Sequence, residues 1–380
     1  MKCFDIAVIG LGAMGSFTAC ELARRKVSVI GFDRLSPPHE EGSHGGETRT
    51  FRTVYKEHPN YVPLMRRSLE LWDRLGQERG VVLLTRSGLI NMGVPKCSLI
   101  EGIQQSATIH NLRVERLSAA EVCQRFPALR PPEDFIGLID DQAGWIDVPA
   151  ALGCALEQAR SFGAHLKLDQ PALEWSIKGG EVIIETLQES FRAKQIVITA
   201  GALAGELLAT LKLPLLVRRQ VLTWFKPYKP ELFDPRALKP FAFSQQGLYG
   251  FPNIKGQGVK IAYHERGDPL PDYPVKVPPV AEADFVPLVD DVTRFLPELI
   301  NPDIDPMNQI LAAKTCLYMM TPDGHFIIDR HPEHQQVCFA AGFSGHGFKF
   351  APLVGEVLSD LALEGKTTLP VEFLRLKGRF

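Results

Sequence analysis

The sequence predicts an α/β protein in which a mainly parallel sheet, built from segments far apart in the chain, is interleaved with a second, mainly antiparallel domain. Three observations support this fold class. The chain opens with an apolar strand, a glycine-rich turn and a helix. Two later segments repeat the order of strand, glycine and helix. The stretches between them are β-rich with many turns, and 380 residues exceed the usual size of one domain.

The composition is that of a globular protein, with 45% hydrophobic and 23% charged residues. A formal net charge of -2 gives no overall field that would attract nucleic acid or an anionic membrane, so we expect neither as a partner. No apolar run is long enough to cross a bilayer, and Asp5 lies where a signal peptide needs its apolar stretch. The seven cysteines are scattered without a CxxC pair, which favours a reducing compartment. We therefore expect a cytoplasmic protein.

The first unit consists of a strand, a helix and a second strand. The apolar run Phe4–Ile9 predicts a buried parallel strand, and Met14–Arg25 predicts a helix. Val27–Phe32 is a second apolar run, and Asp33 closes it. This order is typical of a βαβ unit, whose strands lie in one sheet.

Gly10, Gly12 and Gly15 occupy the turn before the helix with the spacing G-x-G-x-x-G. The first glycine permits a tight turn, the second lets a pyrophosphate approach the backbone, and the third lets the helix pack on the strand. The unpaired N–H groups at the helix N-terminus then hold the diphosphate. Asp33 is placed to accept hydrogen bonds from a ribose hydroxyl, which disfavours NADP. The unit therefore predicts a dinucleotide site.

Two later strands extend the same sheet. Lys194–Thr199 leads through Gly201 into an apolar helix that we expect to end near Leu211. Val337–Ala341 leads through a glycine-rich loop into a helix expected at Ala351–Leu363. Because parallel strands from distant segments must join one sheet, the nucleotide domain is discontinuous.

A small β-meander precedes the first of these strands. Leu173–Ile177 and Glu181–Leu187 flank Lys178-Gly179-Gly180, which is a hairpin turn signal, and the next strand follows directly. No helix separates these strands, so we expect antiparallel pairing here.

The remaining segments differ in character. Val82–Met92 and Val217–Ile261 are β-rich, and Pro269–Pro306 is dense in proline and acid, with a loop expected at 269–280. We expect a mixed or antiparallel sheet with a few helices. The predicted boundaries place residues 1–85, 145–215 and 320–380 in the nucleotide domain, and residues 86–144 and 216–319 in a substrate domain.

Further motifs carry a family resemblance. In chain order they are GLGAMG, Gly42-Ser43-His44 through Arg52, Tyr61–Leu64, Tyr249–Pro252, Lys260–His264, Cys316–Tyr318, His325–His334 and Gly342–Phe350. Over nearly its whole length the chain resembles the monomeric sarcosine oxidase and N-methyltryptophan oxidase family of covalent flavoproteins. The resemblance implies FAD, a fold like that of glutathione-reductase-type flavoproteins, a monomer, and oxidation of secondary amino acids.

The resemblance also implies a covalent flavin. In the family, the cysteine that matches Cys316 forms a thioether to the 8α carbon of the flavin, whereas a bare cysteine is more often an inert core residue. Where the family commonly has a second histidine, this chain has Gly45, so no imidazole handles protons there. The predicted cofactor contacts are Gly10, Gly12, Gly15, Asp33, Ser43, His44, Thr48, Gly201, Cys316, Gly345, Gly347 and Lys349.

A carboxylate clamp is the predicted substrate site. In the resembling enzymes the residues that match Arg52 and Lys349 hold the substrate carboxylate, and Arg49 lies near the flavin, although such arginines are by default solvated surface groups. Arg offers a planar fork for a carboxylate and Lys a point charge. Because Arg49 and Arg52 are three apart, we expect them to share a helical face or bracket a tight turn. Tyr249 is a further predicted substrate contact.

Lys260 is the predicted site of oxygen activation. Most lysines in an alternating strand point at water, but the matching lysine of the family lies over the flavin face opposite the substrate. A preplaced cation there stabilises the negative charge that forms on oxygen. His264 lies on the same face by the period of two, and it and Tyr318 are expected to orient the amine or tune its proton.

The histidines near the C-terminus do not predict a metal site. His331 and His334 have ligand-like spacing, but Pro332 breaks the helix that would align them and no cysteine completes a zinc set. We expect His346 to support the loop at the flavin instead. The helix from Ala351 is expected to point its positive N-terminus at that loop.

The sequence therefore predicts an FAD-dependent oxidase of secondary amino acids that reduces oxygen to hydrogen peroxide. Sarcosine is the expected substrate because His325–His334 looks most like the sarcosine enzymes. An N-methyltryptophan or pipecolate-type oxidase is an alternative, as is an amine dehydrogenase with another electron acceptor. A non-catalytic FAD-binding regulator is the third possibility.

Overall fold

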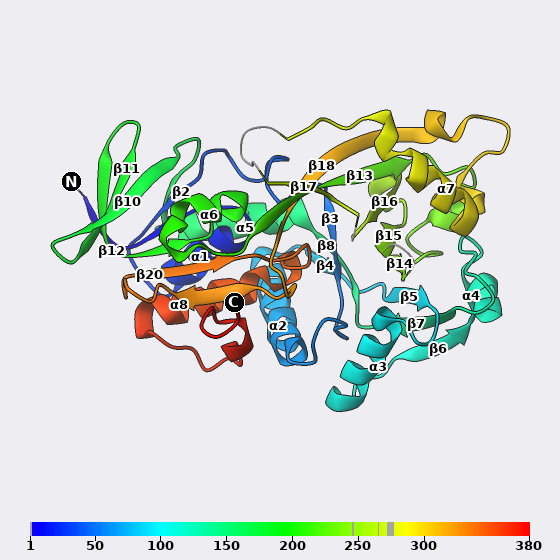
Figure 1. The fold of residues 1–380 in the computed structure, drawn as a ribbon, viewed down its shortest axis with the longest axis horizontal. Helices are drawn as coiled ribbons and strands as arrows, with labels where there is room; N and C mark the ends of the chain where they lie inside the picture. Colours follow the sequence, from blue (N-terminus) through cyan, green and yellow to red (C-terminus); the bar gives the residue numbers. More distant parts are fainter. Residues whose placement is uncertain (1, 245–246, 265, 272–276) are drawn as a thin grey trace.

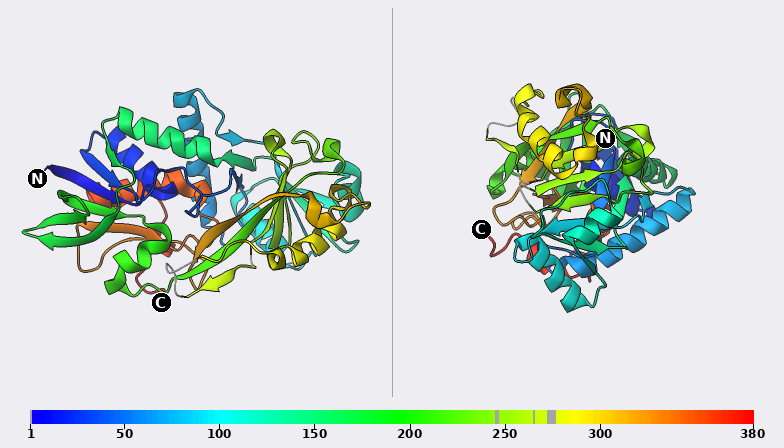
Figure 2. Two further views of the ribbon diagram at one scale, coloured as in Figure 1. Left: turned by 90° about the horizontal axis from the view of Figure 1, so that it is seen from above. Right: turned by 90° about the vertical axis from the view of Figure 1, so that its right-hand side faces the viewer.

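The computed structural model describes residues 2–244, 247–264, 266–271 and 277–380. They form two lobes that lie side by side, and the first strand and the last helix of the chain belong to the same lobe (Figures 1 and 2). One lobe is built around an eight-stranded sheet and the other around a nine-stranded sheet. The α/β fold class with one mainly parallel and one mainly antiparallel sheet is confirmed.

The first sheet contains the predicted parallel strands. β1 (Cys3–Ile9) lies between β2 (Val29–Phe32) and β12 (Ser190–Ile198), and β12 also pairs in parallel with β20 (Val337–Ala341). β9 (His165–Lys167) extends the sheet beyond β2. The four parallel strands predicted to join one sheet therefore do so.

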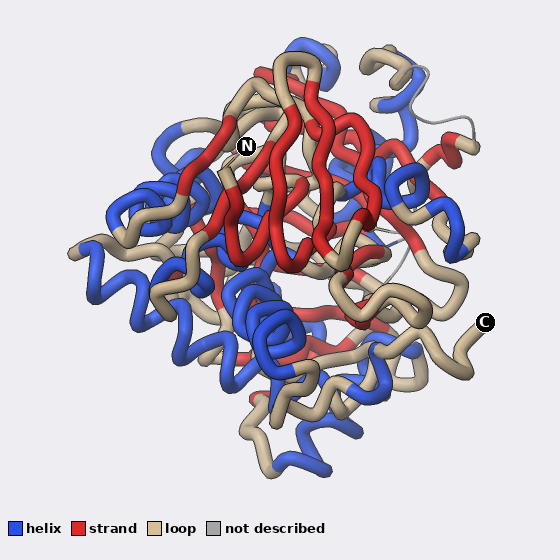
Figure 3. Tube along the Cα trace, turned by 90° about the vertical axis from the view of Figure 1, so that its left-hand side faces the viewer, coloured by secondary structure: helices blue, strands red, loops and turns tan. Residues whose placement is uncertain are grey.

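The meander lies at one edge of this sheet (Figure 3). β10 (Ala172–Lys178), β11 (Glu181–Thr186) and the start of β12 pair antiparallel, as the turn signal predicted. β11 and β20 share one side of β12, because β11 pairs with its first half and β20 with its second. β19 (Ile327–Arg330) pairs antiparallel with β20.

Apolar cores cover both faces of the parallel strands, which explains their continuous apolar runs. Ile6 and Val8 pack into one core with the helices, whereas Ala7 and Ile9 belong to the core on the opposite face. The helices of the first core are α1 (Ala13–Arg24), α2 (Tyr61–Arg79), α5 (Val148–Ser161) and α8 (Ala351–Glu364). The helix expected after Gly201 is only the four-residue α6 (Ala204–Leu207), flanked by two short 3-10 turns.

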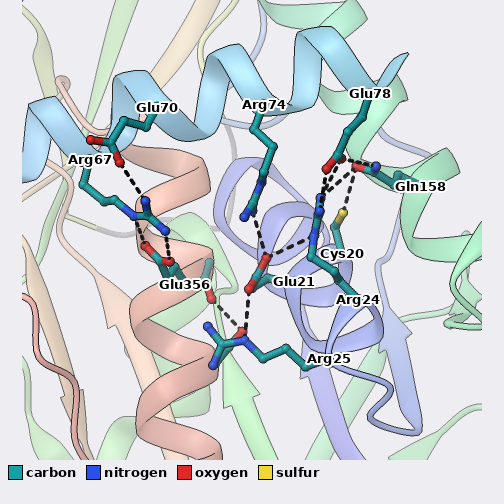
Figure 4. A network of polar contacts seen from close by, with 12 residues as sticks. Cys20, Glu21, Arg24, Arg25, Arg67, Glu70, Arg74, Glu78, Gln158 and Glu356 are labelled. Atoms are coloured by element: carbon teal, nitrogen blue, oxygen red, sulfur yellow. Dashed lines mark hydrogen bonds and ion pairs between the residues drawn. The ribbon is translucent and has the colours of Figure 1, made fainter.

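Ion pairs on the outside of this lobe join α2 to its neighbours (Figure 4). Arg24 of α1 donates to both carboxylate oxygens of Glu78 at 2.7 and 2.8 Å. Arg67 of α2 donates to both oxygens of Glu356 on α8, at 2.9 and 2.6 Å. Bidentate geometry makes these pairs stronger than ordinary surface ion pairs. They hold α2 in place where its inner face reaches the candidate site.

The second sheet is mainly antiparallel, as expected, and only β5 and β14 pair in parallel. Its strands are β5 (Leu89–Gly93), β6 (Glu115–Ser118), β7 (Ile136–Asp140), β13 (Leu216–Phe225), β14 (Phe241–Phe243), β15 (Leu248–Phe251), β16 (Val259–Tyr263), β17 (Asp268–Leu270) and β18 (Ile310–Met320). Helices α3 (Ser98–His110), α4 (Ala119–Arg125) and α7 (Val286–Phe295) accompany it. The prediction of a loop at 269–280 is wrong for its first residues, because β17 pairs there with β13. Residues 272–276 lie outside the described part of the chain.

A small third sheet contains β3 (Thr48–Phe51), β8 (Gly144–Asp147) and β4 (Leu84–Thr85). Arg49 pairs with Ile146 in this sheet, so the expectation that Arg49 and Arg52 share a helical face or bracket a tight turn is wrong. Pairing with β8 keeps this segment extended, which the short polar sequence does not reveal.

The strands of the first sheet all fall within 1–85, 145–215 and 320–380, and we keep the predicted domain boundaries as a proposal on this basis. Within the described ranges, none of the helices combines the length and apolarity required for a bilayer span.

Candidate active site

A cavity of about 380 Å³ runs from the glycine turn after β1 to the inner face of the second sheet. Most of the predicted site residues line it: Gly10, Gly12, Asp33, Ser43, His44, Arg49, Arg52, Gly201, Tyr249, His264, Tyr318, Gly345, Gly347 and Lys349. Gly15, Thr48, Lys260 and Cys316 do not line the cavity and lie behind its wall. The structure therefore gathers residues from both lobes around one space.

The glycine turn has no room for side chains. Gly10 has φ +87°, and a β-carbon there would lie 2.5 Å from the carbonyl oxygen of Thr199. A β-carbon at Gly15 would lie 1.7 Å from the carbonyl oxygen of Gly10, so this glycine allows α1 to pack on β1. Gly12 lines the cavity at the N-terminus of α1, where backbone N–H groups favour a diphosphate.

Asp33 lies at the end of β2 and is 9% exposed. Its two carboxylate oxygens accept hydrogen bonds from the backbone N–H groups of Leu11 at 2.7 Å and Leu35 at 3.0 Å. Each oxygen keeps a second lone pair, which suits the hydroxyl donors of a ribose. The turn and this carboxylate together fit the ADP portion of FAD.

The loop after β20 closes the opposite end of the cofactor site. Gly345 has φ +76°, and a β-carbon there would lie 2.3 Å from the ring of Tyr318. Ser344 is also left-handed, with φ 47°. A 3-10 turn at Phe348–Phe350 then leads into α8, as the predicted loop-to-helix order required.

His346 is fixed in one tautomer within this loop. Its Nε2 lies 2.9 Å from the carbonyl oxygen of Gly324, which only accepts, so Nε2 carries the proton. Its Nδ1 then accepts from the hydroxyl of Tyr55 at 2.5 Å. Burial lowers the pKa of His346 to about 3, so the ring is neutral and supports the loop.

The two cations of the predicted clamp lie over one aromatic ring. Arg52 lies 4.2 Å and the Lys349 ammonium 5.8 Å from the centroid of Tyr55. Arg52 also donates to Glu57 at 2.6 Å, and its buried Nε has no partner in the described part of the chain. The Lys349 ammonium donates to the carbonyl of His346 at 2.6 Å. An unpaired N–H beside a second cation suits a carboxylate ligand.

Two residues of α2 position the backbone of Lys349. Its carbonyl oxygen accepts from Ser68 at 2.5 Å and from the indole N–H of Trp72 at 2.8 Å. Burial, and next the charge of Arg52, lower the pKa of Lys349 well below the usual lysine value. The ammonium is therefore poised to gain a negative partner.

Cys316 lies on β18, 2% exposed. Its Sγ is 3.7 Å from Nη2 of Arg49 and 3.8 Å from the carbonyl oxygen of Ser43, and both of those residues line the cavity. Burial raises the pKa of the Cys316 thiol, while Arg49 and then Lys260 act in the opposite direction. Arg49 is therefore the group that stabilises a thiolate at this position.

Arg49 also fixes the loop that precedes it. Its Nη2 donates to the carbonyl oxygen of Gly45 at 2.6 Å.

Gly45 itself has little room for a side chain. A β-carbon there would lie 2.9 Å from the backbone oxygen of Glu40, so the backbone leaves no space for the histidine that the family commonly has at this position.

Lys260 lies on β16 and is 3% exposed. Its ammonium donates to the carbonyl oxygen of Thr48 at 2.8 Å and to the hydroxyl of the same residue. It also lies 4.2 Å from the ring centroid of Phe251 and 5.9 Å from that of Trp224. Burial, followed by the charge of Arg49, lowers its pKa well below the usual value. The strand therefore delivers a buried cation rather than a solvated one.

His264 and Tyr318 meet at the cavity wall, with ring centroids 5.6 Å apart. Burial, and then the charge of Lys56, lower the pKa of His264 to about 3, so its ring is neutral. Burial raises the pKa of both Tyr318 and Tyr249, and each side chain lies close enough to influence the pKa of the other. A second cavity of about 510 Å³ adjoins this wall behind His264.

Sequence reasoning missed three residues of this site. Tyr55 and Glu57 contact Arg52, but neither carries a motif that separates it from an ordinary surface residue. Asn91 lines the cavity and lies within the buried apolar strand β5. Asn91 could have been found from the sequence, because a polar residue inside an apolar strand often has a functional or structural partner.

Known proteins resemble this chain over its whole length. Residues 5–361 match the family model described as FAD dependent oxidoreductase (DAO). A monomeric sarcosine oxidase of Streptomyces avermitilis is 37% identical over 377 residues, which cover 97% of this chain and 96% of that protein. An N-methyl-L-tryptophan oxidase of Salmonella heidelberg is 32% identical over 367 residues, which cover 96% and 95%.

Solved structures agree on the fold. NikD, an amino acid oxidase essential for nikkomycin biosynthesis, superposes with a TM-score of 0.86 at 24% identity, and the match covers 99% of this chain and 98% of that one. Glycine oxidase of Geobacillus kaustophilus superposes with a TM-score of 0.81 at 20% identity, with 100% of both chains covered. The chain thus belongs to the FAD dependent oxidoreductase family, in the group of monomeric sarcosine oxidases and N-methyl-L-tryptophan oxidases.

Proposed function

We propose that this protein is an FAD-dependent oxidase of N-methyl and related secondary amino acids that uses oxygen as electron acceptor. The observation that carries the proposal is the pair Arg52 and Lys349, two buried cations over one ring at the wall of the cavity. Such a pair suits the carboxylate of an amino acid. The names of the relatives support an amine with an N-methyl group.

The residues of the site would orient the substrate for oxidation. A carboxylate held by Arg52 and Lys349 leaves the amine near the neutral ring of His264 and the hydroxyl of Tyr249. FAD, when bound, accepts the electron pair from the C–N unit and passes it to oxygen. The amine loses two electrons and two protons and becomes an imine, which water hydrolyses, while oxygen gains both and becomes hydrogen peroxide.

The proton on the amine is the remaining requirement, because only an amine with a free lone pair is oxidised. His264 is neutral and buried, and none of the described residues at this wall is a carboxylate that would serve as a strong base. The substrate ammonium therefore loses its proton to solvent, and activity rises with pH until the ammonium groups of Lys349 and Lys260 lose their own protons.

Lys260 is the proposed promoter of the reaction with oxygen. A buried ammonium in an apolar surrounding stabilises a developing negative charge more strongly than one in water. This role distinguishes an oxidase from a dehydrogenase that passes electrons to another carrier.

We further propose that Cys316 holds the flavin as an 8α thioether. Its burial, and the guanidinium of Arg49 at 3.7 Å from its sulfur, support the formation of a thiolate nucleophile there. Acid precipitation tests this link. Flavin absorbance that stays with the precipitated wild type, and passes to the supernatant in Cys316→Ser, supports it; free flavin from the wild type contradicts it.

A panel of amino acids tests the reaction itself. Sarcosine, N-methyl-L-tryptophan and pipecolate would each be mixed with the oxygen-free enzyme, and bleaching of the flavin absorbance would be followed. Peroxide formation in air then separates an oxidase from a dehydrogenase. A protein that binds FAD but is bleached by none of these amines would be a non-catalytic binder. Size-exclusion chromatography tests the monomer that the name of the Streptomyces relative suggests.

A further inference from the structure

One polar side chain in the cavity has no role in the proposed chemistry. Asn91 lies on β5, is 6% exposed, and lines the cavity. Its side-chain amide makes no hydrogen bond within the described part of the chain, whereas its backbone pairs with β7 and β14. An amide that faces a cavity without a protein partner is available to a ligand or to water in that cavity.

The sheet register relates Asn91 to the substrate site. Asn91 pairs with Ala242, Ala242 with Tyr249, and Tyr249 with Ala262. Paired residues on neighbouring strands point to the same face of a sheet, so this row faces the cavity. Neighbouring strands lie about 4.8 Å apart, which puts the backbone of Asn91 about 10 Å from that of Tyr249.

Small side chains keep the path between them open. Ala242 presents only a methyl group between Tyr249 and Asn91, and it lines the cavity itself. Polar groups, Ser244 and Ser98, line the same end of the cavity beside Asn91. A substrate as small as sarcosine has no atoms that extend along this path.

We infer that Asn91 binds the end of the substrate side chain and that the substrates of this enzyme are N-methyl amino acids with an amide-bearing side chain. The inference rests on the proposed function. An amide both donates and accepts, so it forms two reciprocal hydrogen bonds with the amide of Asn91. The backbones of Asn91 and Tyr249 are about 10 Å apart along the sheet, and the side chain of Asn91 spans part of that distance, so a substrate side chain about as long as that of glutamine reaches its amide from beside Tyr249.

Two substrates of similar length test this inference. N-methyl-L-glutamine ends in an amide, whereas N-methyl-L-methionine lacks strong donors and acceptors. The variant Asn91→Leu has nearly the same size and removes both polar groups, so the strand is expected to keep its structure. We expect the variant to lower kcat/KM for N-methyl-L-glutamine about tenfold relative to N-methyl-L-methionine, through KM more than kcat.

A control variant lies in the second cavity. Arg218 lines only that cavity, and Arg218→Gln is expected to leave the ratio between the two substrates unchanged. If Arg218→Gln changes the ratio and Asn91→Leu does not, the side chain occupies the second cavity and the inference is wrong.

Sarcosine distinguishes a failure of this inference from a failure of the proposed function. If the wild type is bleached by sarcosine and Asn91→Leu changes the glutamine-to-methionine ratio less than twofold, Asn91 is a water-satisfied structural amide and only this inference fails. If no N-methyl amino acid bleaches the flavin, both the proposed function and this inference are wrong. Thermal melting of both variants shows that each is folded.

Discussion

The guanidinium of Arg52 and the ammonium of Lys349 lie over the same ring, that of Tyr55, although the two residues are nearly 300 positions apart in the sequence. Like charges so close repel each other, and the pKa of Lys349 is lowered as a result, after the larger effect of burial. A bound carboxylate would relieve both effects at once.

This repulsion predicts that anion binding is pH-dependent. Propionate, a carboxylate without an amine, should bind to the oxidised holoenzyme while Lys349 is protonated. Its affinity should fall as the pH rises through the lowered pKa of Lys349, well below the usual lysine value of about 10.4. The measurement is the perturbation of the flavin spectrum on titration with propionate. Lys349→Met should bind propionate weakly at every pH, and an equally steep pH profile in this variant would contradict the assignment.

Glu57 predicts a stability effect with a defined sign. The guanidinium of Arg52 lowers the pKa of Glu57 despite burial, so the folded state favours the carboxylate. Its contribution is present above the unfolded pKa of about 4.3 and is lost as the pH falls toward the lower folded pKa. Glu57→Gln removes the negative partner of a buried guanidinium and should destabilise the protein by about 3 kcal/mol at pH 7. Urea unfolding at pH 7 and pH 3 measures this difference, which should shrink in acid.

Lys260 predicts a separation of the two half-reactions. Lys260→Met should slow reoxidation of the reduced flavin by oxygen about a hundredfold and change its reduction by substrate far less. In the wild type, reoxidation should slow as the pH rises through the lowered pKa of Lys260, and the variant should lack this dependence. Stopped-flow absorbance measures both steps. Equal losses in the two half-reactions would contradict the assignment.

Gly345 predicts a local effect on the cofactor loop. A β-carbon there meets the ring of Tyr318 at a positive φ, so Gly345→Ala should destabilise the holoenzyme by about 1–3 kcal/mol and weaken flavin retention. Gly153→Ala is the matched control, because Gly153 lies inside α5 with no atom within 4 Å of an added β-carbon. Alanine there should stabilise the helix by about 0.5–1 kcal/mol. Thermal melts of both variants measure these opposite changes in stability, and an equal or smaller loss in Gly345→Ala than in Gly153→Ala would contradict the prediction.

The fold of the cofactor lobe was largely predictable. The glycine turn and the apolar run of β1 constrain each other locally, and β20 has the bounds that its apolar residues indicate. The extended segment β3 was not predictable, because its conformation depends on pairing with β8, nearly 100 residues later. The helix expected after Gly201 is a series of short turns instead. Such short elements are stabilised mainly by tertiary packing, which the local sequence does not reveal.

The residue types of the candidate site could be predicted from the sequence, but the contacts between their side chains could not. The motifs identify Arg52 and Lys349, but only the fold shows that Tyr55 lies beneath both. Likewise, the sequence around Lys260 is that of an ordinary strand lysine, and only the fold shows that Thr48, 212 residues earlier, binds its ammonium. Contacts between distant segments carry no local signal.

The arrangement of the first sheet has a consequence for biosynthesis. β1 leaves the ribosome well before β20, which begins at Val337, and before the loop at 342–347 that borders the same cavity. The nascent chain therefore holds an incomplete nucleotide-binding surface until β20 has emerged. Flavin capture must wait for this strand and loop, so ribosome-stalled fragments that end before residue 337 should not retain the yellow coenzyme.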